Sequence, residues 1–355
     1  MIDPIVELKL AIRENVENGY SSLFDFQALE GCLERPGGNA LQLFLDLRRK
    51  RPGLDSLNWL CLVVGALNYA SFYLSDDEQL SSPDKIEALL RRHFDRIWEL
   101  CTTKNNNPTV PQRAVPFAYE LKDSPRTCVI ELGCSRGDIG LVMLDVDAFL
   151  SGDWFFPNWG RQTTKSLLRE CKSAHKYLGV DTGLECDDEW LLSLWGRHDP
   201  RRDVLGNYYR NHAPLETERF SRISADATLL SAYADIAMKW SSGCENVLFV
   251  TSYMLYQLTP SRRILLARNI REITETLRAR GIGVTWLNQG IAPEAAFQGQ
   301  IRLDDIWLCE FAFEGANIIA KRRAKIEDDT CQNWEMPSSR DQEPVFISCL
   351  DAIDH

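Results

Sequence analysis

A change of pattern near residue 127 constrains the fold of this chain more than any other feature. From there on, short runs rich in Val, Ile and Leu alternate with stretches whose apolar residues recur at helical spacing. Such short runs are typical of buried strands, and their alternation with helices predicts a parallel sheet with helices on both faces. The expected strands are residues 127–132, 176–181, 220–224, 246–251 and 282–287, followed by a hairpin that turns at Glu314-Gly315.

The region before that change has a different pattern, because its apolar residues recur every three to four positions up to about residue 105. The stretch 57–74 is apolar nearly all round, which predicts a helix buried at the centre of this region. A polar, proline-bearing segment, TTKNNNPTVPQ at 102–112, is typical of a linker. We therefore expect two domains: a helical cap domain over residues 1–107, covering the ligand site, and an α/β domain over residues 108–355.

Composition narrows the class of partner. The formal net charge is −11 and the basic residues form no blocks, which argues against nucleic acid or an anionic membrane as the main partner. No uninterrupted apolar run reaches the roughly 18 residues of a membrane span, and the charged N-terminus does not resemble a secretory signal. The 11 cysteines and five histidines are scattered without metal-ligand spacing, so we expect free thiols, no metal site and a cytoplasmic location.

The first predicted strand runs into a turn of small residues, in the stretch CVIELGCSRGDIGLVMLD at 128–145. Four residues at alternate positions join this strand to the start of a helix: Glu131, Gly133, Ser135 and Gly137. Turns of this kind let backbone N–H groups and a helix N-terminus approach a ligand closely. A dinucleotide-binding turn would have glycine where Ser135 and Asp138 stand, and the Gly-Lys-Ser/Thr of a Walker loop is absent.

Two aspartates follow the next two strands in the same way. Asp181 ends the second predicted strand in HKYLGVDTG, and Asp226 follows the third in RISADATLL. The carboxyl ends of neighbouring parallel strands meet at one edge of a sheet, where α/β proteins bind nucleotides. A carboxylate at Asp181 can accept both ribose hydroxyls, while Asp226 and the N–H of Ala227 can bind an adenine ring. Each aspartate taken alone could equally be a turn or strand-end residue.

The ordered motifs resemble those of a family of uncharacterised bacterial class I methyltransferase-like proteins, which use S-adenosylmethionine (SAM) and carry an N-terminal helical region. The resemblance rests on ELGCSRG, GVDTG, DEWLLSLWGRHDPRR, ADATLL and TSYMLYQLTPSRR, in that order, within about residues 20 to 335. It implies a Rossmann-like class I methyltransferase fold, with a mostly parallel seven-stranded sheet, and SAM as cosubstrate. The chain departs from the family at Ile139, which is often Asn, at Thr251, which replaces His, and at NPTV before the first strand.

The residues expected to bind SAM combine the turn, the two aspartates and the family motifs. Arg113 can pair with the methionyl carboxylate through two hydrogen bonds, or it can form a linker salt bridge. The full predicted set is Arg113, Glu131, Gly133, Ser135, Gly137, Asp181, Thr182, Asp226, Ala227, Thr251 and Ser252.

Methyl transfer is an in-line displacement that needs alignment and exclusion of water more than it needs a base. The candidate catalytic residues are Tyr253 and Tyr256, which could bind an acceptor or face the sulfonium, and His198, which could act as a base. The alternatives are core packing for the tyrosines and a surface-loop position for His198. An aromatic-rich insertion, SGDWFFPNWGRQTTK at 151–165, is either a surface loop or one wall of the active site.

These features favour transfer of a methyl group from SAM to a small-molecule acceptor, and they leave the oligomeric state open. Two alternatives remain. SAM could cyclise to azetidine-2-carboxylate and release methylthioadenosine, as the methyltransferase-like azetidine-2-carboxylate synthases do. The chain could also be a non-catalytic binding protein that keeps a SAM fold.

Overall fold

The chain folds into two compact units. The computed structural model describes residues 4–17, 24–51, 56–76, 78–104, 110–121, 124, 126–152, 169, 171–183, 187–196, 199–291, 306–314, 317–326, 334–335 and 344–348. A helical unit comprises residues 1–108 and 187–210, and a sheet unit comprises residues 109–186 and 211–355. The sequence analysis assigned 187–210 to the second domain, whereas the structure groups this segment with the helices.

The helical unit is built around a helix that is buried on nearly all sides, as the apolar stretch 57–74 predicts. That helix is α4, which continues directly into a π-helix at Ala70–Leu74. Its interior positions, Val63 and Leu67 among them, are fully buried. The elements of this unit are α1 (Pro4–Glu17), α2 (Phe26–Leu33), α3 (Asn39–Lys50), α4 (Ser56–Tyr69), α5 (Pro83–Thr103), α10 (Asp188–Ser193) and α11 (Pro200–Asn211).

The segment that contains α10 joins this unit through specific contacts with α4. The side-chain amide of Asn68 donates to the Ser193 carbonyl oxygen at 3.1 Å. A Cβ on Gly65 would lie 2.7 Å from a terminal methyl carbon of Leu194, so this segment packs closely against α4 at a glycine. Buried contacts of this kind account for the grouping of 187–210 with the helices rather than with the sheet.

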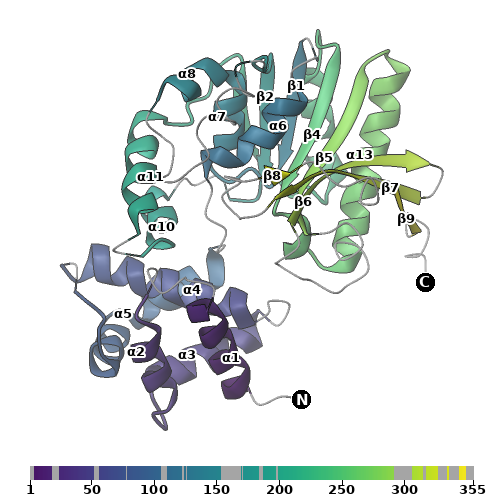
Figure 1. The fold of residues 1–355 in the computed structure, drawn as a ribbon. Helices are drawn as coiled ribbons and strands as arrows, with labels where there is room; N and C mark the ends of the chain where they lie inside the picture. Colours follow the sequence, from purple (N-terminus) through teal and green to yellow (C-terminus); the bar gives the residue numbers. More distant parts are fainter. Residues whose placement is uncertain are drawn as a thin grey trace. The chain divides into compact units, whose positions relative to one another are not determined.

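The sheet unit contains a mixed sheet, shown in Figure 1. Its strand order is β3-β2-β1-β4-β5-β6-β7-β8, and β9 pairs with β7. The bounds are β1 (Thr127–Leu132), β2 (Lys176–Asp181), β3 (Phe220–Ser224), β4 (Asn246–Ser252), β5 (Gly283–Ile291), β6 (Ile306–Glu314), β7 (Asn317–Ile326), β8 (Trp334–Glu335) and β9 (Val345–Ser348). The five predicted strands and the hairpin that turns after Glu314 are confirmed.

The expected α/β fold is confirmed, but the expectation of a mostly parallel sheet is wrong, because the sheet is mixed. Pairing is parallel from β3 to β5, but the pairs β5–β6, β6–β7, β7–β8 and β7–β9 are all antiparallel. The two short strands β8 and β9 both add to β7, and their polar sequence surroundings gave no alternating pattern that would have predicted them.

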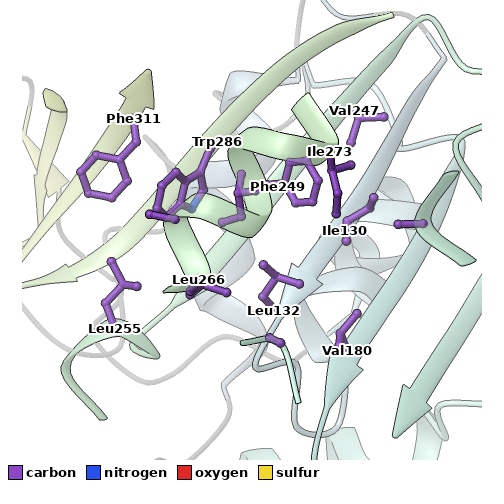
Figure 2. Close-up of a cluster of buried hydrophobic side chains, with 14 of the residues drawn as sticks. Ile130, Leu132, Val180, Val247, Phe249, Leu255, Leu266, Ile273, Trp286 and Phe311 are labelled. Carbon is purple, nitrogen blue, oxygen red and sulfur yellow. The ribbon is translucent and has the colours of Figure 1, made fainter. Parts of the chain in front are cut away.

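Helices cover both faces of the sheet, because alternate residues of each strand point to opposite faces. On one face, Val129 packs in a cluster with residues of α6 (Ala114–Glu120), α7 (Asp138–Leu144) and α8 (Val146–Ser151). On the other face, Ile130 packs with residues of α12 (Ala234–Trp240) and α13 (Pro260–Ala279). Figure 2 shows this second cluster, in which the Trp286 and Phe311 ring centroids lie 4.6 Å apart. None of the described helices is long and apolar enough to cross a membrane.

Candidate functional site at the carboxyl edge of the sheet

The turn after β1 has an unusual backbone. Gly133, Ser135 and Gly137 have φ angles of 81°, 48° and 83°, in the left-handed region that glycine adopts at little cost. Ser135 is the exception, since a side chain disfavours this conformation. The turn is held by a hydrogen bond from the Gly137 N–H to the Cys134 carbonyl at 2.7 Å, and α7 begins at the next residue. These residues therefore carry the chain from β1 into α7 at the carboxyl edge of the sheet.

Asp181, at the end of β2, is directly bound to this turn. One of its carboxylate oxygens accepts the Ser135 N–H at 2.7 Å, and the other accepts the Gly183 N–H at 3.1 Å. The side chain remains half-buried, and the following Thr182 is exposed. The structure thus brings together two predicted site residues that are 46 positions apart, Ser135 and Asp181, and shows that the carboxylate also anchors the turn.

The Glu131 side chain is buried beneath the carboxyl edge of the sheet and has almost no contact with solvent. It is 3 % exposed, and it accepts a hydrogen bond from the Tyr177 hydroxyl at 2.5 Å. Burial raises the pKa of the Glu131 carboxyl well above its ordinary value, the Tyr177 bond acts to lower it, and the nearby charges of Asp138 and Asp181 raise it further. Glu131 is therefore part of the support beneath the turn.

Tyr177 is a site residue that sequence reasoning missed. Its ring stacks on Phe220, and two glycines leave the space that it fills. A Cβ on Gly140 would lie 2.3 Å from the Tyr177 ring, and one on Gly179 would lie 3.0 Å from its hydroxyl oxygen. Both glycines are visible in the sequence, but their relation to Tyr177 depends on the packing of α7 against β2.

Asp226, after β3, is paired within the protein. One carboxylate oxygen accepts from the Thr228 N–H at 2.9 Å and from the Thr228 hydroxyl at 2.7 Å, and the other is ion-paired with Arg262. Partial burial acts to raise the pKa of this carboxyl, but the bonds from Thr228 and the charge of Arg262 outweigh it and lower the pKa. The next residue, Ala227, is buried, and its carbonyl accepts from the Asn269 side chain. This arrangement is that of a turn aspartate, the alternative left open by the sequence.

The ends of β4 and β5 carry polar side chains where a sheet interior is normally apolar. On one face, Trp286 Nε1 donates to the Thr251 hydroxyl oxygen at 3.0 Å, and that hydroxyl donates to Asn288 Oδ1 at 2.9 Å. On the other face, the Ser252 hydroxyl donates to Gln289 Oε1 at 3.3 Å. All four of the polar residues Thr251, Ser252, Asn288 and Gln289 are buried. The sequence analysis singled out the β4 pair and missed the β5 pair, because NQ at the end of an apolar run has no motif signature.

Tyr253 and Arg113 form a buried pair beside β4. The Arg113 guanidinium carbon lies 4.1 Å from the centroid of the Tyr253 ring, and the two side chains are 5 % and 6 % exposed. Tyr253 has a φ of 53°, a left-handed conformation that is costly for an aromatic residue. Its N–H donates to the Gln289 carbonyl at 2.7 Å, which fixes this backbone against β5. Arg113 and Tyr253, predicted separately, are thus brought into direct contact.

The remaining predicted positions divide into two groups. Ile139 lies in the apolar cluster beneath α7, so the family departure at this position is a core residue. His198, the Tyr256 side chain and residues 153–165 of the insertion lie outside the described residues. Within the described part of the chain, no group of three or more His, Cys, Asp or Glu side chains is arranged to hold a metal ion.

No protein-family model matches the chain, and no curated protein matches it. Among solved structures, the chain is similar to the CcbJ methyltransferase from Streptomyces caelestis, at 11 % sequence identity and a TM-score of 0.25. That similarity covers 67 % of this chain and 72 % of the CcbJ chain.

Proposed function

We propose that the sheet unit binds S-adenosylmethionine at the carboxyl edge of its parallel strands and transfers its methyl group to a small molecule. The observation that carries this proposal is the hydrogen bond that joins the left-handed turn after β1 to Asp181 at the end of β2. In the strand order β3-β2-β1-β4-β5, the direction of winding reverses beside β1, between β1 and β4. Crevices at such a reversal, outside the carboxyl ends of the strands, are where open α/β sheets bind ligands.

Asp181 is suited to bind the ribose even though it already accepts two hydrogen bonds. An ionised carboxylate has about four lone-pair sites on its two oxygens, and the Ser135 and Gly183 amides use one site on each oxygen. Two sites remain for the two ribose hydroxyls, which act as donors. The amides also hold the carboxylate in one orientation, so little side-chain entropy is lost when the ribose binds.

The chemistry requires few groups from the protein. In methyl transfer, the acceptor's lone pair forms a bond to the methyl carbon as the carbon–sulfur bond breaks, and the sulfonium becomes a neutral thioether. The chain's part is to align the two reactants and to keep water away from them. Tyr253, held against Arg113 at the end of β4, is our proposed aromatic wall beside the reacting centre.

Titration calorimetry of the full chain with S-adenosylhomocysteine tests the binding step. Asp181→Ala should weaken binding by about 1–3 kcal/mol, because two hydroxyls lose their acceptor in a partly buried site. Asp145→Ala is the matched control, since Asp145 also caps a backbone amide, that of Ala148 at the start of α8, but it lies at the far end of α7 from the turn. Equal affinity in the wild type and Asp181→Ala would remove Asp181 from the site.

Mass spectrometry of the purified protein incubated with SAM tests the reaction. Methyl transfer predicts no turnover of SAM alone and formation of S-adenosylhomocysteine when a suitable small acceptor is added from a screen. Methylthioadenosine and azetidine-2-carboxylate formed from SAM alone, above the level without protein, would show cyclisation instead. Binding without turnover in a broad acceptor screen would favour a non-catalytic SAM-binding protein.

A further inference from the structure

The turn after β1 packs over β2 and comes within reach of β3. The N–H groups of Gly133 and Cys134 donate to the Val180 carbonyl of β2 at 2.8 and 3.4 Å. A Cβ on Gly179 would lie 2.6 Å from Cys134 Sγ, so the turn rests directly on β2 at this glycine. Because β3 is the neighbour of β2 in the sheet, a long side chain on β3 can contact the turn although β1 and β3 are not adjacent.

Arg222 is the β3 residue that makes this contact. It pairs in register with Gly179, and it shares with Phe220 the sheet face that α7 covers, since alternate residues of a strand point to the same face. Its Nη1 donates to the Ser135 carbonyl oxygen at 3.3 Å. A Cβ on Gly137 would lie 3.2 Å from Arg222 Cδ, so the stem of the arginine also packs against the turn.

Ser135 is therefore held on both sides of its Cα atom. Its N–H donates to Asp181 at the end of β2 at 2.7 Å, and its carbonyl accepts from Arg222 on β3. Ser135 has a φ of 48°, in the left-handed region that a side chain disfavours. Contacts from outside the turn are thus needed to select this conformation, and a hydrogen bond from a charged donor is among the stronger ones available.

The two contacts play different parts in the proposed binding of SAM. Asp181 touches the ligand, because its carboxylate accepts the ribose hydroxyls. Arg222 acts on the backbone of Ser135, whose N–H in turn orients that carboxylate. Without the guanidinium, Ser135 can relax to the more favourable negative φ, and its N–H then no longer points at Asp181.

We propose that Arg222 is a positioning residue for SAM, which holds Ser135 in its left-handed conformation and thereby keeps the Asp181 carboxylate oriented for the ribose. This inference rests on the proposed function for the identity of the ligand. Two other roles are outcomes of the test: direct contact of Arg222 with the carboxylate of the ligand, and general support of β3.

Titration calorimetry of the full chain with S-adenosylhomocysteine compares two substitutions of Arg222. Arg222→Met keeps most of the stem and removes the donor, so affinity should fall about tenfold. Arg222→Lys keeps a charged donor, so affinity should return to within about threefold of wild type.

Arg219→Met is the matched control for the loss of an arginine. Arg219 stands just before β3 and also donates to backbone carbonyls, among them those of Ala174 at 2.8 Å and His175 at 3.1 Å. It lies at the amino end of the strand, away from the turn, so affinity should stay within about twofold of wild type. An equal loss in Arg219→Met and Arg222→Met would show general support of β3 and would overturn the positioning role.

Methylthioadenosine separates positioning from direct contact. It shares the adenine and ribose of S-adenosylhomocysteine but lacks the carboxylate. Positioning through Asp181 predicts the same fold-loss for both nucleosides in Arg222→Met. A loss confined to S-adenosylhomocysteine would show that Arg222 binds the carboxylate of the ligand, and the proposal would then be wrong.

Ser135→Gly tests the step through the backbone. Glycine adopts the left-handed conformation about as readily as its mirror image, so Arg222 has less to hold in this variant. The loss caused by Arg222→Met should therefore shrink from about tenfold to about twofold when Ser135→Gly is also present. A loss that stays at tenfold would mean that Arg222 does not act through the conformation of Ser135.

Hydrogen–deuterium exchange of the ligand-free chain measures the hold on the turn without any ligand. The amides of residues 133–137 should exchange faster in Arg222→Met than in wild type or Arg219→Met. Circular dichroism checks the folding of each variant, and Arg222→Gln, whose shorter side chain lacks the charge, replaces Arg222→Met if that chain does not fold. Unchanged exchange together with unchanged affinity would overturn the proposal. If wild type does not bind S-adenosylhomocysteine, the proposed function fails, and the exchange rates decide separately whether Arg222 holds the turn.

Discussion

The carboxyl edge of the sheet has two sides that treat their polar groups in opposite ways. On the turn side, around β1, β2 and β3, the predicted carboxylates are already bound within the protein: Glu131 to Tyr177, Asp181 to backbone amides and Asp226 to Thr228 and Arg262. On the turn side, the carboxylates therefore fix the backbone conformation. On the β4–β5 side, a buried amide nitrogen, that of Asn288, has no partner among the described residues.

The largest expected effect on stability comes from a glycine-to-alanine substitution, which we compare at one position on each side. Gly140→Ala would place a Cβ 2.3 Å from the Tyr177 ring, and the stacking of that ring on Phe220 opposes its displacement. We expect the free energy of unfolding to fall by about 3 kcal/mol, in the upper part of the range for overpacked cores. Gly290→Ala should change it by less than about 0.5 kcal/mol, because the added Cβ would lie at an ordinary contact distance of 3.6 Å from Asn288 Nδ2. Urea denaturation followed by tryptophan fluorescence measures both, and equal losses would break the contrast.

Tyr177→Phe removes the hydroxyl that donates to the buried Glu131 carboxyl. Leaving a buried polar group without its partner should cost about 2 kcal/mol of unfolding free energy. Because the turn itself keeps its bonds to Asp181, the variant should still bind S-adenosylhomocysteine once folded. A loss of binding at full folding would mean that Glu131 and Tyr177 act on the ligand and not only on the support beneath the turn.

The pH dependence of stability should change in Glu131→Gln. Burial raises the pKa of Glu131 in the folded state, so the folded protein holds a proton that the unfolded chain releases above about pH 4.5. The contribution of Glu131 to stability is therefore complete at low pH and is lost as pH rises through the raised pKa. Glutamine stays neutral, so between about pH 4.5 and the raised pKa the stability of the variant relative to wild type should increase by up to about 1.4 kcal/mol per pH unit. Denaturation curves at several pH values that stay parallel for the two proteins would contradict this.

The smallest effect is expected for Asp226→Asn. The ion pair of Asp226 with Arg262 is partly exposed, and such pairs contribute less than about 1 kcal/mol to stability. The lowered pKa of Asp226 means that this contribution is present above the ordinary aspartate range and is lost as pH falls through the folded-state value. Calorimetry with S-adenosylhomocysteine gives the second readout. A several-fold weaker affinity would support the adenine contact, and an unchanged one would leave Asp226 as a turn residue.

The sequence predicted the parts of this fold that depend on local pattern. Apolar runs located β1 to β5, and the small residues at 133–137 predicted a tight turn that the φ angles confirm. The hairpin at Glu314-Gly315 predicted the antiparallel β6–β7 pair. The antiparallel pairing of β5 with β6 and the addition of β8 and β9 to β7 could not be predicted, because they depend on hydrogen bonds between distant segments. The grouping of 187–210 with α4 depends likewise on packing, through Gly65 and Asn68.

In the candidate site, too, the sequence predicted what depends on local pattern and missed what depends on packing between distant segments. Ser135 and Asp181 could be paired from strand order alone, since both stand at carboxyl ends of neighbouring strands. Tyr177 and Asn288 could not, because the first depends on glycines of two elements and the second on a hydrogen-bond chain across two strands. A motif search finds residues that recur at fixed spacing, whereas an unpartnered donor is a property of the folded packing.

A crystal structure of the full chain grown with S-adenosylhomocysteine tests the central claim most directly. The account predicts the ribose hydroxyls on the Asp181 carboxylate and the sulfur over the turn at 133–137. A nucleoside bound elsewhere, with Asp181 contacting only the Ser135 and Gly183 amides, would contradict it.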